Sequence, residues 1–347
     1  MRQRTLGDVT VTAVGLGDVS LVTADRRGLD AREVERAVTE AVELGITLVD
    51  VAPEEAAERG CGDVVRALRL RDRVVLATRV PLVSERFGVP IRDVLQDRLP
   101  ALYVQERVEA TLRATRLDAL PFAQLPLQIS WRGSTAWPEL VGTCARLVRE
   151  GKVMRWGAIV DPAESTGRDG EPELAAQLAS EPWLVGIQAP YNLCDRTAEP
   201  LLASKLCILA RHPLAGGALA GILGPGVRLA PRDDRNSLDA AALEQIAIGA
   251  AHLTALVRHE PAAARSCAAA RTIVERMRRP AHVEALSAGE LALRFVLDRG
   301  AIALPRLHRR AHLVDAISAA LAPPLSPELV ARLDSLFAPP SKIDDER

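Results

Sequence analysis

The stretch that decides the fold is Gly-Ile-Thr-Leu-Val-Asp-Val-Ala-Pro-Glu-Glu, residues 45–55. Its apolar run, Ile46 to Val49, ends in a single acid, Asp50, and a sequence compatible with a helix follows from Glu54. Such a run predicts a buried strand that carries a charged side chain to the C-terminal end of a parallel sheet. Enzymes built from alternating strands and helices keep their chemistry at that end.

Short apolar segments of the same kind alternate with helical segments along the chain. The expected strands are 13–16, 46–50, 74–79, 122–126, 155–159, 185–188, 207–210 and 301–304. Between the first two, 31–44 has a helical apolar stripe, with Asp30 as N-cap and Gly45 as C-cap. Eight strands with intervening helices predict an α/β fold, a (β/α)8 TIM barrel. A Rossmann sheet is the alternative, but the run Gly15-Leu16-Gly17-Asp18 lacks its third glycine.

The segment 222–290 departs from this even rhythm. Residues 222–240 are rich in Gly, Pro, Arg and Asp and predict a surface loop over the barrel mouth. Residues 241–290 predict a helical insertion between strands seven and eight, broken near Pro261 and Pro280. We expect one domain over 1–347, with this segment serving as surface helices, a lid or a dimer contact.

Composition excludes several classes of protein. The formal net charge of −1 argues against a nucleic-acid partner. The N-terminus has no apolar targeting segment, and no run of about twenty apolar residues lacks charges, so no membrane association is expected. The five cysteines are scattered, as in a reduced protein. We expect a cytoplasmic protein with a small-molecule ligand or substrate; a homo-oligomer remains open.

The motifs and their order resemble the aldo-keto reductase family over nearly the whole chain. Arg2 to Gly17 is similar to that family's N-terminal β-hairpin and first strand, and the run from Leu147 to Gly157 to its fourth helix and fifth strand. QAPYNL (188–193) and PLAGGALAG (213–221) then follow at the spacing of strands six and seven. The resemblance implies the barrel fold, a nicotinamide cofactor and carbonyl reduction assisted by Asp, Tyr, Lys and His.

Only the aspartate of that catalytic set is present. Asp50 matches it, whereas the positions of the Tyr, Lys and His are Glu55, Arg79 and Pro126. Asp18 stands where the family often has a threonine near the nicotinamide. The resemblance therefore implies that ordinary NADPH-dependent reduction is weak or absent.

The cofactor positions are altered as well. Gln188 matches the glutamine that binds the nicotinamide carboxamide, but the serine-asparagine pair is Ile159-Val160, and Arg211 replaces the stacking aromatic ring. The final Glu-Asn that would hold adenine is Asp315-Ala316. Other candidate cofactor ligands remain in the loops after strands seven and eight: Leu214, Gly216, Arg306 and Arg310. NADP is thus a possible cofactor; no metal is expected, because no H-x-H or H-E-x-x-H spacing occurs.

The remaining acids and bases favour proton transfer. We take Asp50, Glu55, Arg79 and Asp18 as candidate catalytic residues. Arg79 would keep Glu55 ionised and therefore basic, unless Asp50 neutralises the guanidinium and burial makes Glu55 an acid. The substrate pocket is expected to be lined by Trp131, Tyr191 and His212.

This set predicts dehydratase, isomerase or lyase chemistry on a small polar, anionic metabolite, in specialised metabolism. Two alternatives stay open. One is an atypical NADP-dependent oxidoreductase, and the other is a catalytically silent ligand-binding protein.

Overall fold

The computed structural model describes residues 1–20, 31–83, 93–160, 180–221, 223, 227–229, 231, 240–265, 268, 287–307 and 309–337. Within them, eight strands pair in parallel, in chain order from β3 to β10. Their bounds are β3 Leu16–Val19, β4 Leu48–Val51, β5 Val75–Arg79, β6 Phe122–Pro126, β7 Trp156–Ile159, β8 Leu184–Pro190, β9 Cys207–Arg211 and β10 Ile302–Leu304. They are short and largely buried, as strands covered on both faces are.

The sheet closes between its first and last strands. The backbone N–H of Gly15 donates to the Ala303 carbonyl and that of Ala303 to the Ala13 carbonyl, each at 2.9 Å. The predicted (β/α)8 barrel is confirmed, and the alternative Rossmann sheet is wrong, because an open sheet would leave both edges unpaired. The first strand begins later than predicted: residues 13–15 make the closing bonds, and β3 itself starts at Leu16.

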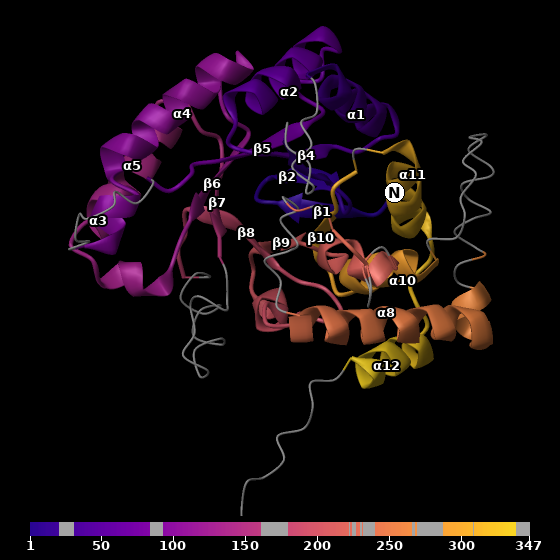
Figure 1. The fold of residues 1–347 in the computed structure, drawn as a ribbon. Coiled ribbons are helices and arrows are strands. Elements are labelled where there is room, and N and C mark those ends of the chain that lie inside the picture. The colour runs from indigo at the N-terminus through magenta and orange to yellow at the C-terminus, as the bar shows by residue number, and fades with distance from the viewer. Residues whose placement is uncertain are drawn as a thin grey trace, which may run out of the picture.

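Helices surround the barrel (Figure 1). Their bounds are α1 Ala31–Glu43, α2 Glu55–Ala67, α3 Val94–Arg98, α4 Ala101–Thr115, α5 Trp137–Arg149, α8 Ala240–His259, α10 Ser287–Asp298, α11 Arg310–Leu321 and α12 Pro327–Leu336, with 3-10 turns η1 Ile129–Gly133, η2 Glu199–Ala203 and η3 Ala215–Ala220. Gly45 follows α1 at a φ of 91°, a conformation that favours glycine and explains why the helix stops there. In the described part of the chain, no helix combines the length and apolar character needed to cross a membrane.

The connection between β9 and β10 carries the predicted helical insertion. It contains η3, α8 and α10, and α8 packs against both of the others. The helix α8 ends at His259, just before Pro261, as predicted; Pro280 lies outside the described residues. Figure 1 places α8 and α12 side by side at one flank of the barrel.

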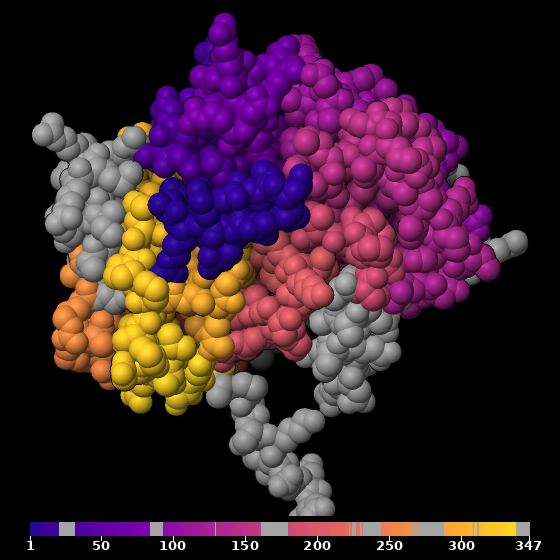
Figure 2. Space-filling model, turned by 180° about the vertical axis from the view of Figure 1, so that it is seen from behind, coloured from indigo at the N-terminus to yellow at the C-terminus, as the bar shows by residue number. Residues whose placement is uncertain are grey.

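An N-terminal hairpin, β1 Gln3–Leu6 and β2 Val9–Thr12, plugs the end of the barrel at which the strands begin. Its Leu6 and Val11 join an interior cluster made with Leu48, Val75, Ala77, Phe122, Leu209, Ile302 and Leu304. In Figure 2 the indigo N-terminal residues lie across the middle of this face. Because apolar side chains fill this end, polar interior groups collect where the strands finish.

Candidate functional site

Asp50 lies in the barrel interior near the finishing end of the strands. Side chains alternate along β4, so Leu48 packs in the apolar interior and Asp50 projects above it. The carboxylate is 1% exposed, and the Arg79 guanidinium from β5 binds both of its oxygens, with Nε 3.2 Å from Oδ1. This bidentate pair occupies the place of the Asp–Lys pair that the family resemblance implies.

Two buried glutamines complete the surroundings of Asp50. Gln124 of β6 and Gln188 of β8 point their amide nitrogens at the carboxylate, at 3.5 Å and 3.1 Å. A carboxylate paired with Arg79 only accepts hydrogen bonds, so each amide oxygen must face away from it. Neither amide oxygen has a hydrogen-bond partner among the described residues. The sequence analysis missed Gln124, although its position two residues before Pro126 placed it inside the barrel.

Asp18 connects this buried pair to the rim. Its backbone N–H donates to Asp50 at 3.3 Å, and its carboxylate contacts Arg79 at 3.2 Å and also pairs with Arg306. Burial opposes ionisation of Asp18, but the charges of Arg306 and Arg79 outweigh it and lower its pKa. The ion pair with Arg306 joins the loop after β10 to β3, so an anionic ligand of Arg306 must compete with Asp18.

His212 is the rim residue whose ordinary pKa lies nearest neutrality. It follows β9 with a φ of 53°, and Asn192 donates to its carbonyl at 3.1 Å, which fixes the turn. His212 is exposed to solvent, but the protein atoms around it and the charges of Arg211 and Arg306 lower its pKa, while Asp18 acts in the opposite direction. The imidazole is therefore neutral at pH 7 and can accept a proton.

Glu55 does not join the cluster around Asp50. It opens α2 with its side chain 74% exposed, and it pairs with Arg59 one turn later. The expected Glu55–Arg79 pair is therefore wrong. The physical reason is helical: the buried face of α2 begins at Ala57 and Glu58, and Glu55 lies on the outer face beside its i+4 neighbour.

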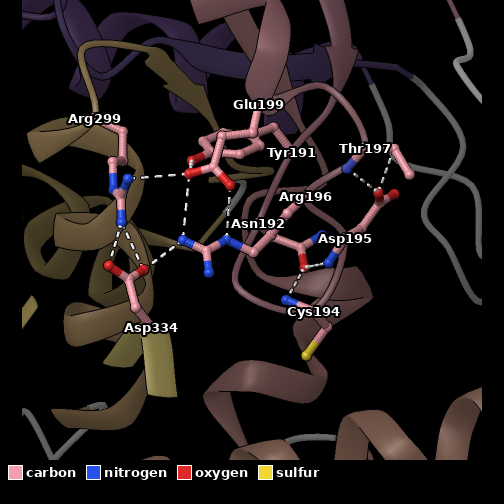
Figure 3. Close-up of polar contacts among 9 residues, drawn as sticks. All are labelled: Tyr191, Asn192, Cys194, Asp195, Arg196, Thr197, Glu199, Arg299 and Asp334. Carbon is pink, nitrogen blue, oxygen red and sulfur yellow. Dashed lines mark hydrogen bonds and ion pairs between the residues drawn. The ribbon is translucent and has the colours of Figure 1, made fainter. Parts of the chain in front are cut away.

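Tyr191 faces the helices rather than the barrel mouth. Its ring centroid is 6.1 Å from that of Phe295 on α10, and its hydroxyl contacts Glu199 at 3.4 Å. Figure 3 shows this tyrosine directed at Glu199, within a network that reaches Arg299 and Asp334. The tyrosine is fully buried, and burial raises its pKa. The prediction that Tyr191 lines the substrate pocket is wrong, because its side chain packs against Phe295 of α10 and Glu199 of η2 instead.

Not all of the residues predicted to bind the cofactor lie at the barrel mouth. After β9, Gly216 and Gly217 adopt positive φ values of 66° and 97° in η3, a backbone conformation that glycine adopts far more readily than other residues. Leu214 is partly buried and packs against the core, and Arg211 ends β9 at the rim. Arg310, however, lies 3.6 Å from Glu40 of α1, on the outside of the barrel.

Trp131 is placed in η1, after β6, and is 4% exposed. Its indole N–H has no hydrogen-bond partner among the described residues. Its role in binding a substrate stays a prediction. In the part of the chain that the structure describes, no group of three or more His, Cys, Asp or Glu side chains could hold a metal ion.

Comparison with known proteins places this barrel in a family. The profile of the family described as "Aldo/keto reductase family" matches residues 13–338. The chain belongs to the aldo-keto reductase family. The resemblance inferred from the motifs is thereby confirmed.

One curated relative of this aldo-keto reductase is methylglyoxal reductase YeaE of Escherichia coli (strain K12). The two are 33% identical over 157 residues, which is 44% of this chain and 46% of YeaE. The match therefore spans about half the length of that relative.

Solved structures show the same fold. A glycerol dehydrogenase, AKR11B4 from Gluconobacter oxydans, superposes with a TM-score of 0.70 at 20% identity, over 97% of this chain and 95% of that one. An aldo-keto reductase from Klebsiella pneumoniae, in complex with NADPH, gives a TM-score of 0.61 at 22% identity, over 99% and 98%.

Proposed function

We propose that this aldo-keto reductase family member transfers protons on a small anionic metabolite, and that conventional carbonyl reduction is weak or lost. One observation carries the proposal. Glu55, at the position of the family's proton-donating tyrosine, points to solvent and pairs with Arg59. Asp50 is a buried acceptor, and Arg79 is a permanent cation. None of these groups can deliver a proton to a carbonyl oxygen in the way that a tyrosine beside a lysine does.

His212 is the group that we assign to proton transfer. Its lowered pKa leaves it neutral and able to accept a proton at physiological pH, and the charge of Asp18 would favour the imidazolium once formed. We therefore assign the acid–base role to His212, just after β9, instead of Glu55, to which the sequence analysis assigned it. A dehydratase, isomerase or lyase needs a proton acceptor of this kind next to the acidic C–H of its substrate.

Three arginines around the mouth support an anionic substrate. Arg79 and Arg306 pair with the acids Asp18 and Asp50, and the charges of Arg211 and Arg306 act on His212, so an anionic substrate would meet guanidinium groups at this rim. A carboxylate or phosphate of the substrate would displace Asp18 from Arg306, and the freed Asp18 would then hold the proton on His212. Binding and proton transfer are thereby coupled through one side chain.

The test uses proton exchange, because it needs no knowledge of the product. Short 2-keto and 2-hydroxy carboxylates are incubated with the protein in D2O, and loss of the C–H signal is followed by proton NMR. We expect exchange that is abolished by His212→Gln and retained in the matched control Glu55→Gln. Exchange that depends on Glu55 and not on His212, or that never exceeds the protein-free rate, would refute the proposal.

A nicotinamide-dependent oxidoreductase is the second candidate. The amide oxygen of Gln188 has no partner among the described residues, and the glycine-rich turn after β9 is retained. In that case Gln188 and the loop containing Gly216 would hold the cofactor, whose reduced form, NADPH, would supply the hydride. The Klebsiella pneumoniae neighbour was crystallised with NADPH, and YeaE is a methylglyoxal reductase.

The two candidates are separated by a fluorescence titration with NADPH and by a methylglyoxal reduction assay. Micromolar binding that Gln188→Leu weakens, together with NADPH oxidation, favours the reductase. Absence of saturable binding at millimolar NADPH favours proton transfer without the cofactor. Restoring the family residues in Glu55→Tyr, Arg79→Lys and Pro126→His together should raise reduction only if the cofactor binds.

A further inference from the structure

A surface cavity lies away from Asp50, at the end of the barrel that the hairpin plugs. Its volume is about 450 Å³, and it opens to solvent between β1, the last turn of α10 and the segment that leads into α12. Figure 2 shows the indigo N-terminal residues directly beside the yellow C-terminal ones on this face. The cavity is therefore built from the two ends of the chain and shares no residue with the barrel mouth.

Two arginines of β1 line this cavity, and their charges are compensated unequally. Arg2 pairs with Asp298 of α10 and donates to the Ala322 carbonyl at 2.9 Å. Arg4 forms no ion pair with any carboxylate among the described residues. Burial lowers the pKa of Arg4 and the neighbouring charge of Arg2 lowers it further, whereas Asp298, already paired with Arg2, acts in the opposite direction. The cavity thus carries an excess positive charge.

The carbonyl contacts of Arg4 hold the guanidinium in place without neutralising it. It donates to Leu297 at 2.6 Å, Gly300 at 2.7 Å and Gln3 at 2.9 Å. The Leu297 carbonyl belongs to the last turn of α10 and the Gly300 carbonyl follows the helix, so the C-terminal end of the helix dipole supplies only a partial negative charge. An arginine has five N–H groups, so two remain free for a further acceptor.

Other parts of the cavity wall favour the same kind of ligand. Pro327 is the first residue of α12, and this helix end adds positive potential, with Ser326 as its N-cap. Leu325 and Val330 supply apolar surface next to the arginines. A cation with free donors beside an apolar wall suits an anion that carries an apolar body.

We propose that this cavity is a binding site for a small organic anion, in which a carboxylate or phosphate contacts Arg4 and an apolar group packs on Leu325 and Val330. The site is separate from the barrel mouth and does not depend on the function proposed for it. Binding joins the hairpin to α10 and α12, so the ligand would stabilise the contact between the two ends of the chain.

The experiment compares benzoate and phenyl phosphate with benzamide, an uncharged molecule of similar shape, by isothermal titration calorimetry on the full chain. We expect saturable binding of at least one anion and none of benzamide. Arg4→Gln should weaken binding at least tenfold, since it removes a hydrogen bond to a charged group. The two anions differ in headgroup, so their ranking shows whether carboxylate or phosphate is preferred.

Two further variants serve as controls for this experiment. Val330→Trp fills the cavity and keeps Arg4, so it should abolish binding even if Arg4→Gln disturbs the end of α10. Arg306→Gln, at the barrel mouth, should leave anion binding unchanged. The proposal is overturned if benzamide binds as well as benzoate, if neither anion binds in the millimolar range, or if Arg306→Gln removes binding while Val330→Trp preserves it.

Discussion

Replacing Asp50 by Asn should destabilise the fold more than any other single change at the barrel mouth. The carboxylate is 1% exposed and accepts hydrogen bonds from Arg79, Gln124, Gln188 and the backbone of Asp18. Asparagine keeps one acceptor oxygen and turns an NH2 group toward donors on the other side. The variant therefore loses a charge next to a buried guanidinium and gains a clash of donors.

The expected loss in the free energy of unfolding depends on the charges that remain near Arg79. Removing one partner of a buried ion pair costs about 3–5 kcal/mol. Because Asp18 still lies 3.2 Å from Arg79, part of the positive charge stays compensated, and we expect the lower end of the range, about 3 kcal/mol. The matched control is Asp18→Asn, whose side chain is 26% exposed and whose loss should cost about 1 kcal/mol.

Urea unfolding followed by tryptophan fluorescence measures both variants. The midpoint of Asp50→Asn should fall well below that of Asp18→Asn, with the same dependence on urea, because the surface exposed on unfolding is unchanged. If the two variants unfold at the same midpoint, the Asp50–Arg79 pair is not the centre of the site, and the reasoning fails.

Three further predictions concern packing, pH and the C-terminal helix. Gly157→Ala would place a methyl carbon 2.3 Å from Phe122 inside the barrel, which should cost about 1–3 kcal/mol in urea unfolding; an unchanged midpoint would contradict this. Glu58 is buried between α2 and α4, and burial raises its pKa. The folded state therefore favours the protonated carboxyl. The free energy of unfolding of the wild type should fall as pH rises from the ordinary pKa of 4.5 through the raised value, whereas that of Glu58→Gln should not. If the two proteins show the same pH dependence, this prediction is wrong. Asp334→Asn removes the acid that holds α12 to two arginines (Figure 3) and should cost about 1 kcal/mol, whereas the exposed Asp118 should tolerate the same change; equal effects would argue against the network.

Much of the fold could be predicted from the sequence, because strand position and helix boundaries are local properties. The apolar run before Asp50 is a strand, Gly45 ends α1, and α8 stops before Pro261. Each follows from side-chain hydrophobicity or backbone freedom within a few residues. The family resemblance then supplied the order of strands around the barrel.

The candidate site was predictable only in part. Asp50, Arg79 and Gln188 lie within strands or at a strand end, so alternation along a strand places their side chains in the barrel interior. Glu55 and Tyr191 lie just beyond strand ends, where the direction of a side chain depends on the phase of the next helix or turn. Both face away from the mouth for that reason.

The sequence by itself determined that this chain forms a barrel, and it placed Asp50 at the end of a buried strand. Only the tertiary structure decided which charges meet. Asp18 pairs with Arg306 across the seam where the barrel closes, and Arg4 of the hairpin reaches the end of α10. Such partners are separated by nearly the whole chain, and the pairing is set by barrel closure rather than by any local preference. The lowered pKa of His212, which the sequence offered only as a pocket residue, likewise depends on charges that the fold brings near it.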